Sequence, residues 1–342
     1  LLNLVSLSVL FYYRGPLKQT ISKVITSYLS LFYTGFIFWG GLSYFYAINP
    51  TEVLVNITRQ VNVLLMFLSM AILLFNQKNK ARFISWAISI ILSVEVYAVL
   101  SQALEMVNST GVISSGTLKG VAANRNITAF SIAIKIPFVL YLVGLLKKTS
   151  FKVLITALIF LALVSLSMIQ SRASFIGVGL ITVGYVALQI LIYFRYTKNT
   201  KTLLSIRYIL VPLLLAITVN QTVIANKGAD ALSRAATISL STNDGSVNQR
   251  LRYYMDVLTH ITSNPIIGTG LGNWKLKSID YDKNDVVGYV VPYHAHSDFI
   301  QLGAELGIIG FLFYLGVFLW AVYYVFIFIR HSKSSVEEKT FV

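Results

Sequence analysis

The 342-residue chain contains no cysteine and few charged residues, and both shortages narrow its class. Without cysteine it has no disulfides, no thiolate metal ligands and no cysteine nucleophile. Charged residues make up 12% of the chain, whereas 56% is hydrophobic and the mean hydropathy is +0.71. A soluble domain carries about twice that charged fraction. The composition therefore favours a membrane protein over a water-soluble domain.

Apolar runs of about 20 residues recur along the chain, which is the length that crosses a hydrocarbon core as a helix. We predict an all-α polytopic membrane protein, a bundle of about nine or more transmembrane helices with one long polar loop. The expected division is a helix bundle over 1–223, the loop over 224–300, and a last span with its tail over 301–342. The expected spans are 1–13, 24–47, 60–76, 82–104, 127–146, 152–170, 174–194, 205–223 and 307–329.

Basic residues gather in alternate connections between these spans, and Glu337 and Glu338 are the acidic residues found there. The remaining loops carry basic and acidic residues in nearly equal number. The positive-inside rule places the basic loops in the cytoplasm and the loop 224–300 outside it. The net charge of +15 therefore reflects topology, and no nucleic-acid partner is expected. The basic residues of these connections are Arg14, Lys18, Lys23, Lys78, Lys80, Arg82, Lys147, Lys148, Lys152, Arg195, Lys198, Lys201, Arg207, Arg330, Lys333 and Lys339.

Two charged residues, Glu95 and Lys135, fall inside consecutive spans at similar depth. An intramembrane charge is costly unless it is paired, and it is a functional candidate by default. One interpretation is a structural ion pair. The other is the midplane relay of a transporter, although paired half-helices broken by Gly or Pro are not evident.

Arginines stand at two places where an anion could bind. Arg172, in "MIQSRASF", lies in a short connection at the outer end of two spans. Its planar fork suits phosphate oxygens, and the alternative is an arginine that anchors the interface. Arg250 and Arg252 open "QRLRYYMDVLTHITSNP", whose apolar spacing predicts an amphipathic helix ending before Pro265.

The expected N-cap of this loop helix is Ser246 or Asn248, which places both arginines in its first turn. Cations are unfavourable at that end of a helix, and this conflict suggests an anionic partner, although surface arginines at such places are common.

Two further polar stretches have structural interpretations. "PIIGTGLGNW" is not a dinucleotide fingerprint, because no strand precedes it and no helix plainly follows, so we interpret it as a tight turn. "VAANRNITAF" places Asn124 and Asn126 at the outer mouth of a span. Their side chains cap the helix in one interpretation and hydrogen-bond a sugar in the other.

The stretch "YHAHSDFIQLGAELGIIG" concentrates polar residues just before the last span. His294 and His296 with Asp298 are too few for a zinc site of ordinary spacing, so no metal is expected. A histidine near pH 7 serves as a base or holds a hydroxyl by a hydrogen bond. Asp298, Gln301 and Glu305 follow at helical spacing, and such a polar stripe must face protein or water.

Taken together, these motifs resemble the O-antigen ligase family of bacterial inner-membrane proteins. The likeness is closest over 246–310, where "QRLRYYMDVLTHITSNPIIGTGLGNW" is followed by "AHSDFIQLGAELGIIG". "GVAANRNITA" and "SRAS" resemble further family elements, and the resemblance spans roughly 115–325. Ser297 departs from the asparagine usual in the family. Family members usually have more than one span after this motif, and the chain begins at Leu1, so we expect a sequence clipped at both ends.

The resemblance implies a fold similar to the C-type glycosyltransferases and an enzyme in the bacterial inner membrane that acts on the periplasmic face. It implies an inverting transfer of a glycan from undecaprenyl diphosphate, in contact with membrane lipids and without metal or cofactor. Arg172 and Arg250 would hold the diphosphate, and His296 would activate the acceptor hydroxyl. Residues expected to contact substrate are Arg252, His294, Asn124, Asn126, Asp298, Gln301 and Glu305.

The acceptor stays open, because lipopolysaccharide ligases, O-antigen polymerases and protein O-oligosaccharyltransferases share these motifs. It would be lipid A-core, a growing glycan or a protein, respectively. The transporter based on Glu95 and Lys135 remains the alternative from another class.

Overall fold

The computed structural model describes residues 2–238, 245–282 and 293–330. Every regular element in these ranges is a helix, which confirms the all-α prediction. The tail expected after the last span lies outside the described residues.

Seven helical stretches in the described part of the chain are long and apolar enough to cross a membrane. The predicted span 24–47 instead forms two helices, α2 (Arg14–Ile25) and α3 (Tyr28–Leu42), as a pair bent by 72°. The predicted span 1–13 forms α1 (Leu2–Tyr12), which is shorter. The polytopic class is therefore confirmed, and the described residues hold seven such candidate spans, or eight if the bent pair is one span. The seven are Pro50–Leu74, Lys80–Thr110, Arg125–Leu145, Thr149–Ile169, Arg172–Thr197, Thr200–Lys227 and Asp298–Ile327.

The chain forms two compact units. Unit 1 combines Leu1–Lys78 with Leu240–Arg330, and unit 2 is built on Asn79–Ser239. This division follows contacts, whereas the three-part division predicted from the sequence follows membrane topology and stays a prediction.

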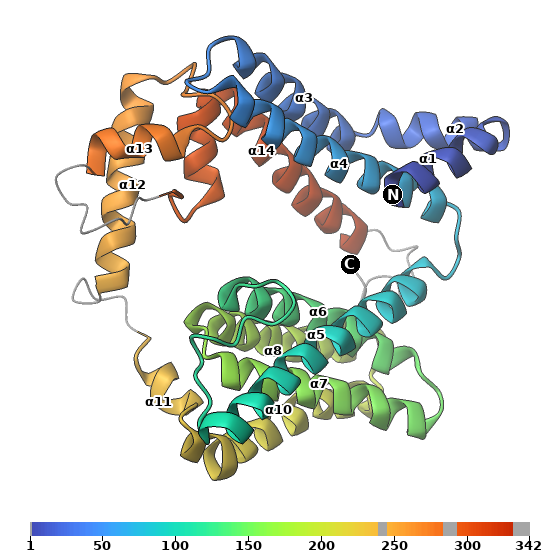
Figure 1. Cartoon of the computed structure of the whole chain (residues 1–342). Coiled ribbons are helices and arrows are strands. Elements are labelled where there is room, and N and C mark those ends of the chain that lie inside the picture. The colour runs from blue at the N-terminus through green and yellow to red at the C-terminus, as the bar shows by residue number, and fades with distance from the viewer. Residues whose placement is uncertain (1, 239–244, 283–292, 331–342) are drawn as a thin grey trace. The chain divides into compact units, whose positions relative to one another are not determined.

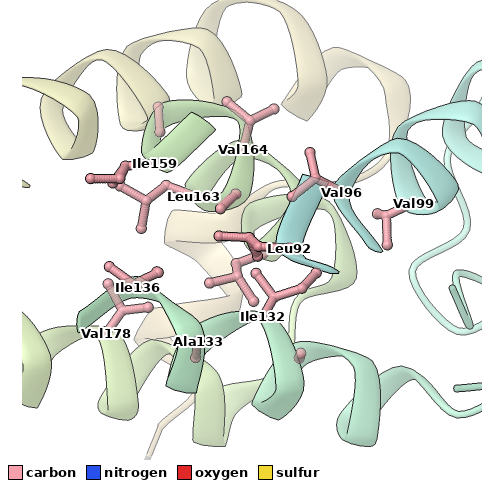
Figure 2. Close-up of a cluster of buried hydrophobic side chains, with 14 of the residues drawn as sticks. Leu92, Val96, Val99, Ile132, Ala133, Ile136, Ile159, Leu163, Val164 and Val178 are labelled. Carbon is pink, nitrogen blue, oxygen red and sulfur yellow. The ribbon is translucent and has the colours of Figure 1, made fainter. Parts of the chain in front are cut away.

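Unit 2 is a bundle around one apolar core. Helix α6 (Arg125–Leu145) packs against α5 (Lys80–Thr110), α7 (Thr149–Ile169) and α8 (Arg172–Ile192), and α10 (Arg207–Val219) packs along α7. Apolar side chains from these helices interlock over several turns, as Figure 2 shows. Such continuous burial holds the helix ends, where the polar motifs lie, in fixed register. Among its core residues are Leu92, Val96, Ile132, Ile136, Ile159 and Leu163.

Unit 1 is organised around the last helix, α14 (Asp298–Arg330), as Figure 1 shows. Helix α3 packs along α14 and against α4 (Pro50–Leu74), while α12 (Gly245–Ser263) and α13 (Trp274–Asp282) pack against the first turns of α14. Two small cores result. One contains Phe36, Val53, Leu271 and Leu306, and the other contains Val257, Trp274, Ala295 and Ala304.

Candidate functional site

The predicted amphipathic loop helix is present as α12, with differences at its start and on its faces. It begins at Gly245, so Ser246 and Asn248 lie inside the helix and the predicted N-cap is wrong. Arg250 and Arg252 therefore fall in the second turn, where the repulsion by the helix dipole is weaker. The apolar spacing predicted a stripe of Leu251, Tyr254, Met255, Leu258 and Ile261. Leu251, Met255 and Leu258 are exposed, whereas Ile261 packs against a buried core.

The other face of α12 is buried in unit 1. Tyr253, Val257 and His260 are each less than 9% exposed. His260 Nδ1 lies 3.1 Å from the Tyr281 hydroxyl, and its ring packs against Trp274. This face fixes α12 on α13 and thereby sets the direction of Arg250.

The glycine-rich stretch is a tight turn, as predicted, although a helix does follow it at Trp274. Gly270 has φ of 94° and Gly272 has φ of 77°, which favour glycine. A Cβ on Gly268 would collide with the backbone of Ala304 and Glu305. The turn therefore needs glycine both for its conformation and for its close approach to α14.

The turn lies against a break in α14 at Gly307, which has φ of 66° and ψ of −170°. Thr269 N–H donates to the Ala304 carbonyl at 3.0 Å, and Gly270 N–H donates to the Glu305 carbonyl at 2.8 Å. On the far side of the break, Ile308 N–H donates to the Pro265 carbonyl at 2.9 Å. The backbone groups released by the break are thus satisfied by the turn.

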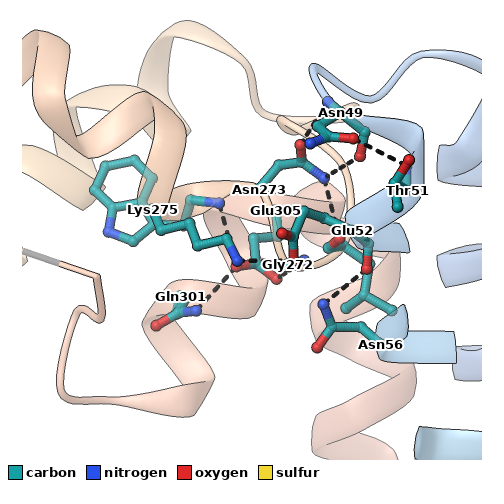
Figure 3. Close-up of polar contacts among 11 residues, drawn as sticks. Asn49, Thr51, Glu52, Asn56, Gly272, Asn273, Lys275, Gln301 and Glu305 are labelled. Atoms are coloured by element: carbon teal, nitrogen blue, oxygen red, sulfur yellow. Dashed lines mark hydrogen bonds and ion pairs between the residues drawn. The ribbon is translucent and has the colours of Figure 1, made fainter. Parts of the chain in front are cut away.

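Glu305 is 2% exposed, and its carboxylate holds this region together (Figure 3). One oxygen accepts the Gly272 N–H at 2.7 Å. The other accepts the Trp274 N–H at 3.3 Å and the Gln301 amide at 2.9 Å. The Gln301 carbonyl in turn accepts the Ala295 N–H at 3.1 Å, next to His296. A buried chain of hydrogen bonds therefore connects the turn to the histidine loop.

A second set of contacts, which the sequence did not suggest, joins the turn to the α3–α4 connection (Figure 3). The side chain of Asn273 is fully buried, accepts the Asn49 N–H at 2.7 Å and donates to the Asn49 carbonyl at 3.3 Å. Lys275 and Glu52 form an ion pair at 2.7 Å. In the sequence, Asn273 could have been singled out because it directly follows the glycines of this stretch and precedes Trp274.

His296 is exposed and has φ of 58°, a left-handed conformation that is uncommon outside glycine. Its ring stacks on Tyr253 with centroids 6.0 Å apart, and its carbonyl accepts from the Tyr254 hydroxyl at 3.4 Å. Partial burial lowers the pKa of His296, and the charges of Arg250 and then His294 lower it further. The imidazole is consequently neutral near pH 7 and able to accept a proton.

The remaining candidates of unit 1 lie around this histidine. His294 and Asp298 are exposed, and the Arg252 guanidinium lies over the Tyr253 ring at 5.6 Å. Within the described residues, His294, His296 and Asp298 form no cluster suited to a metal ion. Their predicted substrate contacts stay predictions.

Arg172 belongs to unit 2, where it is the first residue of α8. Its Nε donates to the Thr237 hydroxyl at 3.1 Å, and Arg234 Nε donates to the Gln170 carbonyl at 3.5 Å. Helix α11 (Ala231–Ala236), which carries Arg234, therefore lies beside the start of α8 at Arg172. Arg234 was not singled out from the sequence, because single arginines in polar loops give no signal.

Asn124, at the start of α6, has the structural role that capping predicts. The Asn124 side chain accepts the N–H groups of Asn126 and Ile127 at 2.9 and 3.3 Å. Asn126 is exposed, and a sugar contact by either residue stays a prediction.

Glu95 and Lys135 meet, as their matching depth predicted. Lys135 Nζ lies 3.0 and 2.9 Å from the two carboxylate oxygens of Glu95, and the Ser131 hydroxyl donates to Glu95 at 2.8 Å. Both side chains are about 15% exposed. Such a saturated pair fits a structural role for unit 2.

Several apolar spans, a loop helix bearing arginines and an exposed neutral histidine define a multi-pass membrane protein with a polar site at one helix end. Residues 156–315 match the family model described as O-Antigen ligase. This match over 160 of the 342 residues supports the O-antigen ligase family, as the motifs predicted, and that family implies a glycosyl-transferring membrane enzyme. No curated protein matches the chain.

Proposed function

We propose that the protein transfers a glycan from undecaprenyl diphosphate to an acceptor hydroxyl on the periplasmic side of the bacterial inner membrane. The observation that carries this proposal is His296. It is exposed, held in a left-handed conformation by the Gln301–Glu305 chain, and adjacent to the charge of Arg250 within the family match. Strained, well-supported residues of this kind concentrate at functional sites.

In the proposed reaction the acceptor oxygen attacks the anomeric carbon of the donor sugar and inverts it. The bond from that carbon to the diphosphate oxygen breaks, and the hydroxyl proton passes to the neutral imidazole of His296. The electron pair leaves with undecaprenyl diphosphate. His294 is the weaker candidate for the same proton, because the family motif begins at His296.

Guanidinium groups are suited to the developing negative charge on the leaving diphosphate. Arg250 is exposed in the second turn of α12 and has no hydrogen-bond or ion-pair partner among the residues that the structure describes. We assign it to the diphosphate, with Arg252 as a lesser contributor. The same assignment for Arg172 rests on the family resemblance.

For Gln301 and Glu305 we propose positioning rather than direct substrate contact. Glu305 is 2% exposed and already accepts three hydrogen bonds, so no substrate group reaches it without displacing the turn. Gln301 holds the backbone beside His296 through Ala295.

The proposal is tested by transfer from purified undecaprenyl-diphosphate-linked glycan to each of three acceptors: lipid A-core, a second lipid-linked glycan and a protein. Wild type should transfer to one of them, and a chelator should not reduce the rate. His296→Ala should lose about 10²–10⁴-fold in rate, the range of a general acid–base group, while donor affinity persists. His294→Ala is the matched control and should lose much less. Transfer to none of the acceptors, or equal losses in both variants, refutes the proposal.

Orientation has its own test, because the chain contains no cysteine. A cysteine replacing Asp280 in α13 should react with an impermeant thiol reagent in spheroplasts. A cysteine replacing Lys198 should react only after lysis. The reverse pattern would place the proposed site in the cytoplasm.

A further inference from the structure

Two adjoining cavities lie at the end of unit 2 that is remote from Arg172. Helix α8 starts at Arg172, and its last turns, including Tyr185 and Gln189, border the first cavity. At 1.5 Å per residue, Gln189 stands roughly 25 Å along the helix from Arg172. These cavities are therefore separate from the end of α8 at which Arg172 lies.

Both cavities have mostly apolar walls, and the first holds more hydroxyl and amide groups. The first has a volume of about 610 Å³, and its wall combines apolar side chains such as Leu140 and Leu145 with polar groups, among them Gln189, Thr202 and Ser205. The second, of about 510 Å³, runs along α7 and α10 and is mostly apolar. Its wall includes Val153, Ala157, Phe160, Val211 and Leu215. Val153, Val211 and Leu215 are between 49% and 62% exposed, so this groove opens on the outer surface of the unit.

Basic side chains stand where the cavities meet. Lys152, Arg207 and Tyr208 line both cavities, and Lys201 lines the first. The Arg207 guanidinium lies 5.0 Å from the centre of the Tyr208 ring and donates to its hydroxyl at 3.1 Å, and Lys152 Nζ lies 5.8 Å from the same ring. Within the described residues, Lys152, Lys201 and Arg207 have no carboxylate partner. The junction therefore carries uncompensated positive charge.

The backbone adds to this field. Helices α7 and α10 run side by side and both begin here, at Thr149 and Arg207, so their positive dipole ends point the same way. Neither helix has a side-chain N-cap that hydrogen-bonds its first turn.

We propose that these joined cavities bind one anionic phospholipid. The phosphodiester would lie between Lys152 and Arg207, the rest of the headgroup beside the hydroxyl and amide groups of the first cavity, and an acyl chain in the groove between α7 and α10. Basic pockets between transmembrane helices bind anionic headgroups on the side that holds the basic loops. The apolar groove beside the cations favours a lipid over a free anion, which would leave that groove empty. This site is independent of the proposed transfer reaction.

The test measures binding of phosphatidylglycerol to purified protein in nanodiscs of phosphatidylcholine, by native mass spectrometry. Wild type should retain one phosphatidylglycerol in preference to phosphatidylcholine. The pair Lys152→Gln and Arg207→Gln should weaken binding about 25-fold, fivefold for each cation. The pair Lys148→Gln and Lys198→Gln removes equal charge from the same loops outside both cavities, and it should weaken binding less than about twofold if binding is local.

One further variant and one competition measurement complete the test. Ala157→Phe fills the apolar groove and leaves every cation in place, so it should also displace the lipid, and it carries the test if the double variant does not fold. Glycerol phosphate, the headgroup without chains, should not compete at concentrations equal to the lipid. Equal weakening by the control pair, wild-type binding by Ala157→Phe, or effective competition by glycerol phosphate would each overturn the proposal.

Discussion

The backbone N–H of Gly272 donates to the carboxylate of Glu305 at 2.7 Å and thereby joins two motifs that lie 33 residues apart. The same carboxylate accepts from Trp274 and Gln301. The glycine turn, the start of α13 and the histidine loop are consequently held by one buried side chain. Replacing Glu305 should therefore affect both the stability of the folded protein and the geometry around His296.

Glu305→Gln should destabilise the protein by about 1–3 kcal/mol, the cost of leaving a buried group without its partner. An amide offers one acceptor oxygen, so either Gly272 or Trp274 would face an NH₂ group. Denaturant unfolding in detergent measures the effect. Asp298→Asn, on an exposed carboxylate of the same helix, is the control and should stay within about 0.5 kcal/mol. Equal stability of the two variants would show that the carboxylate charge is dispensable.

Gly307→Ala should cost more than the roughly 1–3 kcal/mol of a non-glycine residue in this backbone conformation, because its Cβ would also collide with the Ile266 carbonyl. Gly184→Ala is the matched control. Gly184 lies inside α8, and a Cβ at this position would meet no heavy atom within 4 Å, so alanine should be neutral or stabilise by about 0.5–1 kcal/mol. Thermal unfolding in one detergent compares them, and a tolerated Gly307→Ala would mean that the break is not required.

The pH profile of transfer should report His296. Its lowered pKa keeps the imidazole neutral at pH 7, so kcat/KM should fall only as the pH drops through that pKa. Arg250→Gln removes a nearby positive charge, which raises the pKa of His296 and should move the acid limb to higher pH. An acid limb that stays in place in Arg250→Gln would separate Arg250 from His296.

Arg172→Lys keeps the charge but removes the guanidinium fork and the Nε donor to Thr237. If Arg172 binds the diphosphate, the transfer rate should fall about 10²-fold or more while unfolding is unchanged. Thr237→Val removes the hydroxyl that accepts from Arg172 and donates to the Arg234 carbonyl, and it should cost much less. Near-normal transfer by the lysine variant would make Arg172 an interface anchor.

Glu95→Gln should destabilise unit 2 by about 3–5 kcal/mol, because it leaves Lys135 buried without its carboxylate. Adding Lys135→Met to that variant should restore most of the loss, and the double variant should still transfer glycan. Unfolding midpoints and transfer rates decide between this structural pair and a relay, since a relay would fail in the double variant.

Much of the fold follows from hydropathy and charge. The apolar runs predicted the helices of unit 2, and the cost of a lone buried charge predicted that Glu95 meets Lys135. The bend inside the predicted span 24–47 was missed. There the Ser27 side chain accepts the Ser30 N–H at 3.3 Å and starts a new helix, a signal hidden within a continuous apolar run.

The site was predictable in its residue types and less so in its contacts. The polar stripe before the last span predicted that Gln301 and Glu305 face protein or water. Their partners are backbone N–H groups of Ala295, Gly272 and Trp274. Nearly every residue has a backbone N–H, so the sequence does not indicate which of them a side chain will contact. The buried hydrogen bonds between Asn273 and Asn49 join positions 224 residues apart, and this pairing was missed because the sequence does not indicate which backbone groups Asn273 contacts.

We expect the break at Gly307 to mark the place where α14 enters the hydrocarbon core. From Ile308 to Ile327 the helix rises about 30 Å, which equals the thickness of a hydrocarbon core. The turns from Asp298 to Leu306 would then project beyond the hydrocarbon, and Glu305 would need no counter-charge within lipid. This short projection would hold His296 at most about 15 Å above the hydrocarbon edge, measured along the helix. Its length would limit how far from the bilayer a hydroxyl can meet this histidine.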